Sequence, residues 1–482
     1  MSSRPRVEKQ SIEVVIGRTQ SVCPVCLKRI PAERVKEGDC VFLRKTCGEH
    51  GSFKTIIWRG QPDYLSWQQQ KKPEHPKVCL TEIEKGCPFD CGLCPDHRQQ
   101  ICCALLEVTQ RCNLGCPVCF ADAGKEGPVK DPTLEELTER LRMVRIATGA
   151  CNIQLSGGEP TVRDDLPDII RAARSLGYTF FQLNTNGIRL AEDPDYVLAL
   201  KEAGLSWVFL QFDGTEDEIY RRLRGRGLFK AKQKAIDNCG RQELGVVLVP
   251  TLVPRINTDH IGDIVRYALK RMPVIRGVHF QPISYFGRYP LPPEDKDRIT
   301  LPEVVRALEE QTNGLLKVDD FVPSDCESSV CSFHGDFIYM EDGTLTPSSK
   351  KQNACCCSRE NDRGESVLKS RNFVRSRWRI QKSTTFCSPE SSGEQQDSWH
   401  AVLHRIRNYR LSITCMAFQD AYNMDLERLR YCCVSVIDSG KTIPFCAYNL
   451  SSRDGHSLYR GKAQISASRS SCGRAQEGET RL

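Results

Sequence analysis

The sequence predicts an α/β protein built on a partial (β/α)6 barrel, with a small metal-binding ribbon before the barrel and a cysteine-rich domain after it. Between residues 104 and 290, six short apolar segments alternate with amphipathic ones, which is the pattern of parallel strands connected by helices. On both sides of this region cysteines recur at spacings of two and three residues, which is typical of metal sites. The expected regions are a metal ribbon at 1–75, a cluster-binding connector at 76–103, the barrel at 104–300, a cysteine-rich domain at 301–460 and a disordered tail at 461–482.

Composition indicates a globular protein of a reducing compartment. Of 482 residues, 27% are charged and 26 are cysteine, and the formal net charge is +7. That charge is small for the length, and we expect no nucleic-acid partner. The chain has no apolar stretch long enough to span a bilayer, and its start lacks the apolar segment of a secretory signal. We therefore expect a cytoplasmic protein without a transmembrane segment, whose cysteines bind metals rather than form disulfides.

The barrel strands are expected where short apolar runs are followed by turn residues. Six units of strand and helix in sequence indicate a barrel or part of one, in which chemistry lies at the C-terminal ends of the strands. A helix at 301–313 and a hairpin turning at Asp342 and Gly343 are expected after it. The expected strands are 104–109, 152–156, 178–184, 206–212, 246–252 and 277–282, and helical patterns cover 133–148, 166–177 and 195–204.

Three cysteines follow the first expected strand, in "RCNLGCPVCF". A [4Fe–4S] cluster normally takes four thiolates, one on each iron. Three thiolates on one loop would leave one iron open to a small molecule, so we expect a substrate-binding cluster here. Its ligands would be Cys112, Cys116 and Cys119.

The ends of the next strands carry glycine and polar residues. "SGGEP" follows the second strand, and its glycines would let backbone approach a ligand closely, while Glu159 can pair with an ammonium group. The third and fourth strands end in "NTNG" and "QFDG", whose polar side chains suit ribose hydroxyls or a carboxylate. Together these strand ends fit an amino acid joined to a nucleoside. The candidate residues are Gly157, Gly158, Glu159, Asn186, Gln211 and Asp213.

As a set, these motifs resemble the radical S-adenosylmethionine (SAM) superfamily over about residues 100–290. The resemblance implies that the three cysteines hold a [4Fe–4S] cluster and that the methionine part of SAM chelates the open iron. It implies that Gly157, Gly158 and Glu159 hold the amino group of SAM. The aromatic residue that often precedes the third cysteine is replaced by Val118, with Phe120 following the cysteine.

A second cysteine triplet with the same spacing lies upstream, in "GCPFDCGLCPDH". Cys102 or Cys103 could supply a fourth thiolate, and we favour Cys102 because Cys103 begins a strand. We expect a closed auxiliary iron–sulfur cluster that passes electrons or holds structure, with an open iron as the alternative. Its ligands would be Cys87, Cys91, Cys94 and Cys102.

Near the N-terminus, "CPVC" and "CGEH" are separated by strand-like sequence, as in zinc ribbons and rubredoxin-like iron sites. We expect one zinc or iron ion held by Cys23, Cys26, Cys47 and His50, with Cys40 as the alternative to the histidine.

The C-terminal third suggests another auxiliary cluster, with one of the adjacent Cys432 and Cys433 among its ligands. The other ligands would be Cys326, Cys331 and Cys446. The run Cys355 to Cys357 could be a redox-active or substrate-binding site, or a dispensable loop.

Over about residues 20–460, "CPVCLKRIPA", "GCPFDCGLCPDHRQ" and "CCVSVIDSGKTIPFCAYN" are similar to a narrower group of radical SAM proteins. It contains tetraether lipid synthases, class D radical SAM methyltransferases and the (seleno)protein group TrsS. The resemblance implies C–C bond formation or methylation of a small-molecule, lipid or peptide substrate, with an electron donor such as ferredoxin or flavodoxin. The alternatives are a peptide-modifying maturase with auxiliary clusters and a non-enzymatic zinc and iron–sulfur protein.

Overall fold

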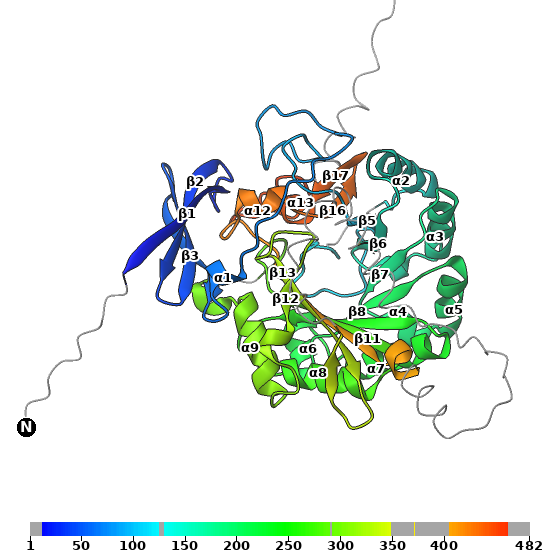
Figure 1. Cartoon of the computed structure of the whole chain (residues 1–482). Coiled ribbons are helices and arrows are strands. Elements are labelled where there is room, and N and C mark those ends of the chain that lie inside the picture. The colour runs from blue at the N-terminus through cyan, green and yellow to red at the C-terminus, as the bar shows by residue number, and fades with distance from the viewer. Residues whose placement is uncertain (1–11, 125–129, 290–291, 349–370, 372–403, 461–482) are drawn as a thin grey trace, which may run out of the picture.

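The computed structural model describes residues 12–124, 130–289, 292–348, 371 and 404–460. In this part of the chain the strands form a four-stranded antiparallel sheet and a separate 13-stranded sheet (Figure 1). The expected tail at 461–482 and the run Cys355 to Cys357 lie outside the described residues.

The four-stranded sheet is formed by the N-terminal region, on the left in Figure 1. Its strands pair in sequence order, and a short helix, α1 (Tyr64–Trp67), follows them. Buried Trp58 packs edge-on against Tyr64, with ring centroids 5.4 Å apart. Lys45 donates hydrogen bonds to the Ser21 hydroxyl and to the Ala421 carbonyl, which joins this sheet to the C-terminal region. The strands are β1 (Glu13–Val22), β2 (Arg29–Glu37), β3 (Cys40–Cys47) and β4 (Gly51–Arg59).

Six parallel strands form the centre of the larger sheet, in the order expected for a partial barrel. They pair as neighbours from first to last, and the first and last do not pair with each other, so the barrel is open. Each expected strand overlaps an observed one. The strands are β5 (Cys103–Thr109), β6 (Asn152–Gly157), β7 (Phe181–Thr185), β8 (Trp207–Gln211), β9 (Gly245–Val249) and β11 (Ile275–Pro282), with the short β10 (Thr251–Leu252) beside β11.

Helices between these strands cover the outside of the barrel, and one more helix follows the last strand (Figure 1). The first begins at a capping box, in which the Thr133 side chain and the Glu136 side chain each accept a backbone N–H of the other residue. The second of the two helices after β7 is capped by Gly204, whose φ of 111° is in the left-handed region. The helices are α2 (Leu134–Thr148), α3 (Leu166–Ser175), α4 (Ile188–Glu192), α5 (Pro194–Ala203), α6 (Asp217–Arg224), α7 (Phe229–Arg241), α8 (Ile261–Lys270) and α9 (Leu301–Gln311), and three 3₁₀ turns span Pro160–Val162, Asp295–Asp297 and Val318–Asp320.

The region that follows the barrel adds strands to both edges of the barrel sheet. On one side β15 pairs in parallel with β11 and antiparallel with β13, and on the other β16 pairs in parallel with β5. The described strands between residues 301 and 460 therefore extend the barrel sheet. The elements are β12 (Val322–Pro323), β13 (Ser332–Tyr339), β14 (Leu345–Pro347), β15 (Arg410–Met416), α12 (Leu426–Arg430), β16 (Val434–Asp438), β17 (Lys441–Pro444) and α13 (Phe445–Tyr448).

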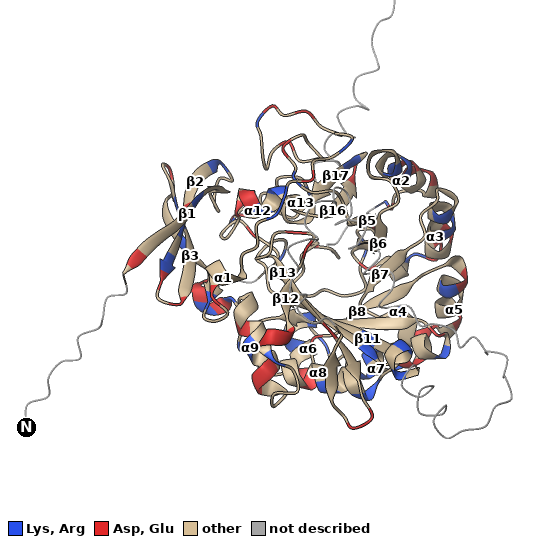
Figure 2. Ribbon diagram, viewed as in Figure 1, with Lys and Arg blue, Asp and Glu red and all other residues tan. Residues whose placement is uncertain are grey.

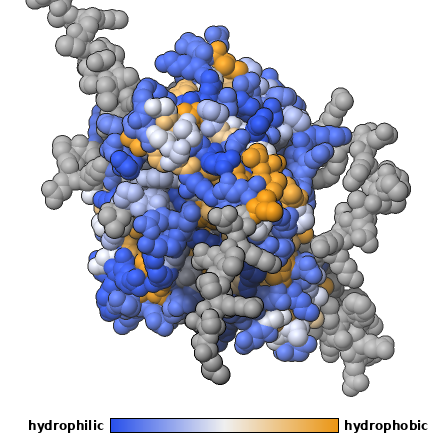
Figure 3. Space-filling model, turned by 90° about the vertical axis from the view of Figure 1, so that its left-hand side faces the viewer, coloured by the Kyte–Doolittle hydropathy of each residue, from blue (hydrophilic) through white to orange (hydrophobic). Residues whose placement is uncertain are grey.

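Charge and hydropathy follow this layered arrangement. Charged residues are frequent on the outer helices, whereas the barrel strands are mostly uncharged (Figure 2). The face that carries the N-terminal sheet is predominantly hydrophilic, with small separate hydrophobic patches (Figure 3). Among the described residues, no helix is long and apolar enough to span a membrane.

Candidate active site and metal centres

A cavity of about 960 Å³ reaches from the C-terminal ends of the barrel strands into the barrel interior. The strands that extend the sheet, β13, β15 and β16, contribute to its wall. The cavity brings together most of the residues that the sequence suggested for cofactor binding. Those that line it are Cys112, Cys116, Cys119, Gly157, Gly158, Glu159, Asn186 and Gln211.

The loop that carries Cys112, Cys116 and Cys119 follows β5 and is held by the far side of the barrel. Cys119 and Arg288, which follows β11, exchange backbone hydrogen bonds of 3.0 and 2.9 Å. Burial raises the pKa of the Cys112 thiol to about 11. This thiol therefore stays protonated at neutral pH unless a metal replaces its proton.

The glycines of the "SGGEP" turn allow it to approach the cysteine loop closely. A Cβ atom on Gly157 would lie 2.1 Å from the Thr109 carbonyl oxygen, and one on Gly158 would lie 2.2 Å from that of Arg111. The Gly158 N–H donates to the Thr109 carbonyl at 2.8 Å. In the structure these glycines approach backbone at the start of the cysteine loop, and both also line the cavity. Their close approach to a ligand stays a prediction.

The Glu159 carboxylate is buried and organises the ends of two strands. Its Oε1 accepts hydrogen bonds from the Thr161 N–H, the Thr161 hydroxyl and the Thr185 hydroxyl, at 3.1, 2.7 and 2.7 Å. Its Oε2 accepts the Asn186 N–H at 2.6 Å. Oε1 thus accepts three hydrogen bonds and Oε2 accepts one, so Oε2 is the oxygen with acceptor capacity left for an ammonium N–H.

The polar residue Asn186 connects the third strand end to the cysteine loop. Its Nδ2 donates to Asn113 Oδ1 at 2.7 Å, and its Oδ1 accepts the Ile188 N–H at 2.9 Å. The side chain is therefore fixed against the loop that carries the cysteines. Asn113, which the sequence analysis did not single out, positions it.

Asp213 requires a correction, because it is fully buried and does not line the cavity. Both of its oxygens accept from Arg224, at 2.7 and 2.9 Å. Burial raises the pKa of Cys116, and the neighbouring Arg224 guanidinium opposes that rise. Asp213 thus positions Arg224 beside the cysteine loop, instead of facing a ribose.

Gln211 lines the cavity with its amide already paired. Its Oε1 accepts from Lys232 at 2.8 Å, and its Nε2 donates to Asp213. Burial lowers the pKa of Lys232 to about 7. The sequence analysis did not find Arg224 or Lys232. Arg224 lies on α6 and Lys232 on α7, and both are more than ten residues beyond the end of β8.

A second group of thiols lines the same cavity. Cys102, Cys326 and Cys433 are buried, and their sulfur atoms all lie within 4.8 Å of one another. Hydrogen bonds from the Cys326 and Cys433 thiols lower the pKa of Cys102 to about 6. Cys433 also contacts a Glu327 carboxylate oxygen at 3.4 Å. Three convergent sulfurs with one pKa near 6 are a donor set that fits a metal centre.

The sequence analysis placed these three cysteines in two different clusters, and the structure brings them together. Cys102 was expected to complete the Cys87 triplet, but its N–H donates to the Cys433 carbonyl at 2.8 Å and its thiol meets Cys326 and Cys433. Cys331 was expected beside Cys326, but its sulfur accepts from Arg428 at 3.2 and 3.4 Å.

Cys446 and Cys432 also stand outside the Cys102 group. The Cys446 sulfur accepts the Gln419 N–H at 3.2 Å. Burial raises the pKa of Cys432 well above its ordinary value, and nearby Cys446 and Cys331 raise it further. Cys331, Cys432 and Cys446 are therefore neighbours.

The Cys87 triplet is buried near the C-terminal end of the described chain. A hydrogen bond from Cys91 lowers the pKa of Cys87, and burial raises that of Cys94. The Tyr459 hydroxyl accepts the Cys91 N–H at 2.9 Å and donates to the Pro88 carbonyl at 2.7 Å. The loop is thus fixed by a residue more than 360 positions later in the chain.

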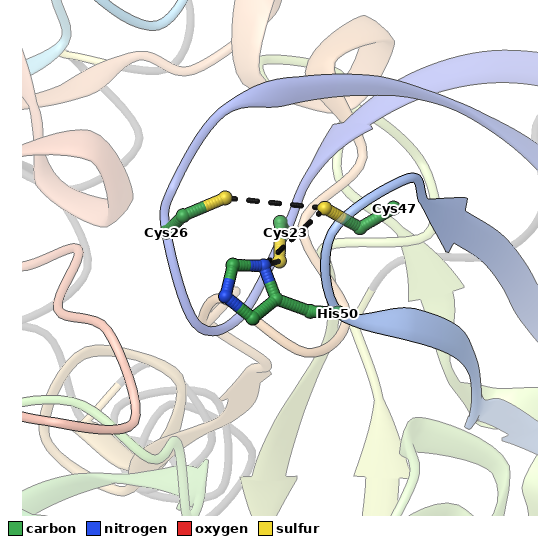
Figure 4. A group of neighbouring side chains, drawn as sticks. All are labelled: Cys23, Cys26, Cys47 and His50. Carbon is green, nitrogen blue, oxygen red and sulfur yellow. Dashed lines mark hydrogen bonds between the residues drawn. The ribbon is translucent and has the colours of Figure 1, made fainter.

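At the N-terminal sheet, Cys23, Cys26, Cys47 and His50 converge at one end (Figure 4). Cys26 and Cys47 sulfurs are 4.0 Å apart, and His50 Nδ1 lies 3.5 Å from the Cys47 sulfur and 3.7 Å from that of Cys23. A tetrahedral ion with bonds of ~2.3 Å separates its ligands by ~3.8 Å. The four residues therefore fit a single zinc or iron ion.

Cys40 does not belong to this group. It begins β3, whereas Cys47 ends the same strand. Seven residues of extended chain separate them by ~23 Å. The histidine, and not Cys40, is the fourth member of the N-terminal site.

Comparison with known proteins matches two family models to this chain. The radical SAM superfamily model matches residues 106–268, which run from within β5 to within α8 and include the Cys112 loop. The HMPTM N-terminal zinc ribbon domain model matches residues 15–59, which contain the four converging metal-site residues.

A curated relative covers nearly the whole chain. The 7,8-dihydro-6-hydroxymethylpterin dimethyltransferase of Methanocaldococcus jannaschii is 38% identical over 90% of this chain and 93% of its own length. The chain belongs to the radical SAM superfamily. It is a member of the radical SAM family that contains this dimethyltransferase, and that membership excludes the non-enzymatic alternative.

Other known proteins match smaller portions of the chain. A probable GTP 3′,8-cyclase of Methanococcus aeolicus is 28% identical and covers 39% of this chain and 62% of its own. Among solved structures, Streptococcus suis SuiB bound to SAM superposes with a TM-score of 0.36 and 15% identity, over 45% of this chain and 48% of its own. Methylornithine synthase superposes with a TM-score of 0.36 and 16% identity, over 57% of this chain and 82% of its own.

As a radical SAM enzyme, the protein uses a [4Fe–4S] cluster and SAM. When bound, the reduced cluster supplies one electron that breaks the C5′–S bond of SAM, giving methionine and a 5′-deoxyadenosyl radical that can abstract hydrogen from a C–H bond. Three cavity-lining thiols on one loop fit a cluster with one open iron. The additional cysteine groups and the zinc ribbon indicate auxiliary metal sites.

Substitution of Gly158 tests the contact between the "SGGEP" turn and the cysteine loop. Gly158→Ala is expected to lower the free energy of unfolding by ~2 kcal/mol, because the new Cβ meets backbone that cannot move freely. Gly115→Ala is the matched control, since a Cβ there meets nothing within 4 Å. The midpoint of chemical unfolding should fall for the first variant only, and equal midpoints would show that the approach is not constraining.

The N-terminal site gives a second prediction. His50→Ala in the full-length protein should reduce the content of zinc plus iron by about one ion per chain, while Cys40→Ala should retain it, because Cys40 lies outside the ligand group. Elemental analysis of the two purified variants measures this. Loss of the ion from Cys40→Ala alone would reverse the assignment.

Proposed function

We propose that this radical SAM enzyme methylates a reduced pterin of the 7,8-dihydro-6-hydroxymethylpterin class. The observation that carries the proposal is the 38% identity, over 90% of the chain, to a dimethyltransferase named for that substrate. The similarity extends through the zinc ribbon, the barrel and the C-terminal strands that wall the cavity. A cavity of about 960 Å³ is in the range expected for a cofactor and a small molecule together.

The site residues take separate roles in this proposal. Cys112, Cys116 and Cys119 hold the cluster whose open iron binds SAM. The "SGGEP" turn offers the remaining acceptor position of Glu159 to the SAM amino group, and Asn186 fixes that turn against the cysteine loop. Gln211 contributes to the polar wall of the cavity and is held by Lys232 behind it, and Asp213 acts through Arg224.

The other cysteine groups are assigned to auxiliary metals. We propose that Cys102, Cys326 and Cys433 hold an auxiliary iron–sulfur cluster, since their sulfurs converge on the substrate cavity. Cys87, Cys91 and Cys94 form a second, buried site under Tyr459. The N-terminal residues bind zinc or a mononuclear iron that stabilises the ribbon.

The reductive cleavage of each SAM requires one electron, and a reduced ferredoxin or flavodoxin is the proposed donor. We place the enzyme in the cytoplasm, because its many free cysteines need a reducing compartment.

The proposal is tested by incubating the reconstituted full-length enzyme anaerobically with SAM, a reductant and 7,8-dihydro-6-hydroxymethylpterin. Mass spectrometry should show pterin carrying one or two added methyl groups, together with 5′-deoxyadenosine. Formation of 5′-deoxyadenosine with unchanged pterin would reject the pterin substrate. A peptide or lipid substrate would then become the alternative.

A further inference from the structure

The inner face of the barrel is lined by carboxamides where such barrels usually carry branched apolar residues. Side chains alternate between the two faces of a strand, so every second residue points into the barrel. On β6 and β7 the residues of this set that line the cavity are Asn152, Gln154, Gln182 and Asn184. Gln182 is buried and Gln154 is partly buried, so this face of the barrel presents polar groups to a molecule in the cavity.

Two of these amides stand side by side. Gln154 on β6 and Gln182 on β7 are direct register partners in the parallel sheet. Neighbouring strands are ~4.8 Å apart, so the two side chains can reach adjacent atoms of one ligand.

The orientation of the Gln182 amide is set by its neighbour Trp207. The Trp207 Nε1–H lies 3.4 Å from Gln182 Oε1. Because an indole nitrogen can donate and cannot accept, the Gln182 oxygen must face Trp207. The NH₂ group of Gln182 is therefore the part left for a molecule in the cavity.

Gln154 is oriented in a similar way by Cys103. The Cys103 sulfur lies 3.7 Å from Gln154 Oε1. A cysteine thiol can donate to an amide oxygen, and at this distance the Cys103 thiol is placed to do so. The NH₂ group of Gln154 is therefore also the part of the amide left for a molecule in the cavity.

Aromatic rings stand across the same space. The rings of Phe209 and His279 both line the cavity, with centroids 5.7 Å apart and planes at 44°. Burial lowers the pKa of His279 to about 4, and the imidazole is therefore neutral, with Nδ1 hydrogen-bonded to the Thr414 hydroxyl at 2.7 Å. Two rings beside paired N–H donors suit a flat heterocycle with adjacent acceptors.

We propose that Gln154 and Gln182 form a paired N–H donor that binds the pterin edge carrying the carbonyl oxygen and the neighbouring imine nitrogen. Phe209 packs against the ring, and Trp207 and Cys103 are positioning residues for the two amides. The identity of the ring rests on the proposed function. The recognition of two adjacent hydrogen-bond acceptors follows from Gln154 and Gln182 themselves.

The test measures equilibrium binding of 7,8-dihydro-6-hydroxymethylpterin to anaerobic holoenzyme by titration calorimetry. Gln182→Met and Gln154→Met keep the length of the side chain and remove its N–H donors. Each should weaken binding about 10- to 100-fold. Gln70→Met is the matched control on an exposed residue and should bind as the wild type does. Iron content and the unfolding midpoint report whether each variant is folded.

A ligand analogue separates this inference from the proposed function. In the deaza analogue the imine nitrogen is replaced by C–H. The wild type should prefer the pterin over this analogue, and Gln182→Met should bind the two about equally. If the wild type binds the pterin and both methionine variants bind it unchanged, the paired-donor assignment is overturned while the proposed function stands. If the wild type does not bind the pterin at all, both are overturned.

Discussion

Replacing Cys112, Cys116 or Cys119 with alanine is expected to abolish the reductive cleavage of SAM while leaving the barrel folded. A cluster normally takes one thiolate on each iron, and a loop with two remaining cysteines cannot hold three irons. The side chains lie at the cavity surface on a loop, and the strands of the sheet do not depend on them. The assay is 5′-deoxyadenosine formation by dithionite-reduced protein after reconstitution with iron and sulfide.

The matched control is Cys79→Ala, which removes an exposed cysteine outside the described metal groups. It should form 5′-deoxyadenosine at the wild-type rate. Cleavage of SAM at the wild-type rate by the triple-alanine variant would reject the assignment of the Cys112 loop.

A second large effect is expected at the thiol group that shares the cavity. Cys102→Ala or Cys433→Ala should lower the iron content by about one cluster, that is ~4 irons per chain. Both residues line the cavity, but neither belongs to the loop that carries Cys112. Formation of methylated product should therefore fall much more than uncoupled cleavage of SAM.

Cys103, the neighbour of Cys102 in the sequence, provides the control for the predicted loss of iron. Cys103→Ala should retain iron, since the Cys103 thiol lies outside the converging group and its pKa is raised by burial. If Cys102→Ala retained its iron and Cys103→Ala lost it, the thiol group would have been assigned to the wrong member of the pair.

The six barrel strands could be predicted because each is a short apolar run whose burial follows from its own sequence. β5 to β11 each overlap an expected strand, and the helices α2, α3 and α5 begin within one residue of expectation. The N-terminal ribbon could be predicted for the same local reason, since Cys23 and Cys26, and Cys47 and His50, are paired by short spacings.

The partners of Cys102 could not be predicted from spacing. Cys94 is eight residues away along the chain, and this proximity favoured the wrong group. The actual neighbours are decided by strand pairing, because β16 joins β5 with Val434 opposite Cys103, which places Cys433 beside Cys102. Pairing between strands 330 residues apart leaves no periodic signal in the sequence.

Asp213 shows a related limit. Its place at a strand end is the same as that of Gln211, two residues earlier, yet it faces Arg224 on helix α6 rather than the cavity. Side chains two residues apart share a face only while the strand continues, and β8 ends at Gln211.

The division of labour between the cysteine groups is the central claim, and EPR spectroscopy of the reduced enzyme with and without SAM tests it most directly. SAM should perturb the signal of the cluster that is lost in the Cys116→Ala variant and leave unchanged the signals lost in Cys91→Ala and Cys433→Ala. If SAM instead shifted only a signal that Cys91→Ala or Cys433→Ala removes, the open iron would lie at that site and the account would be contradicted.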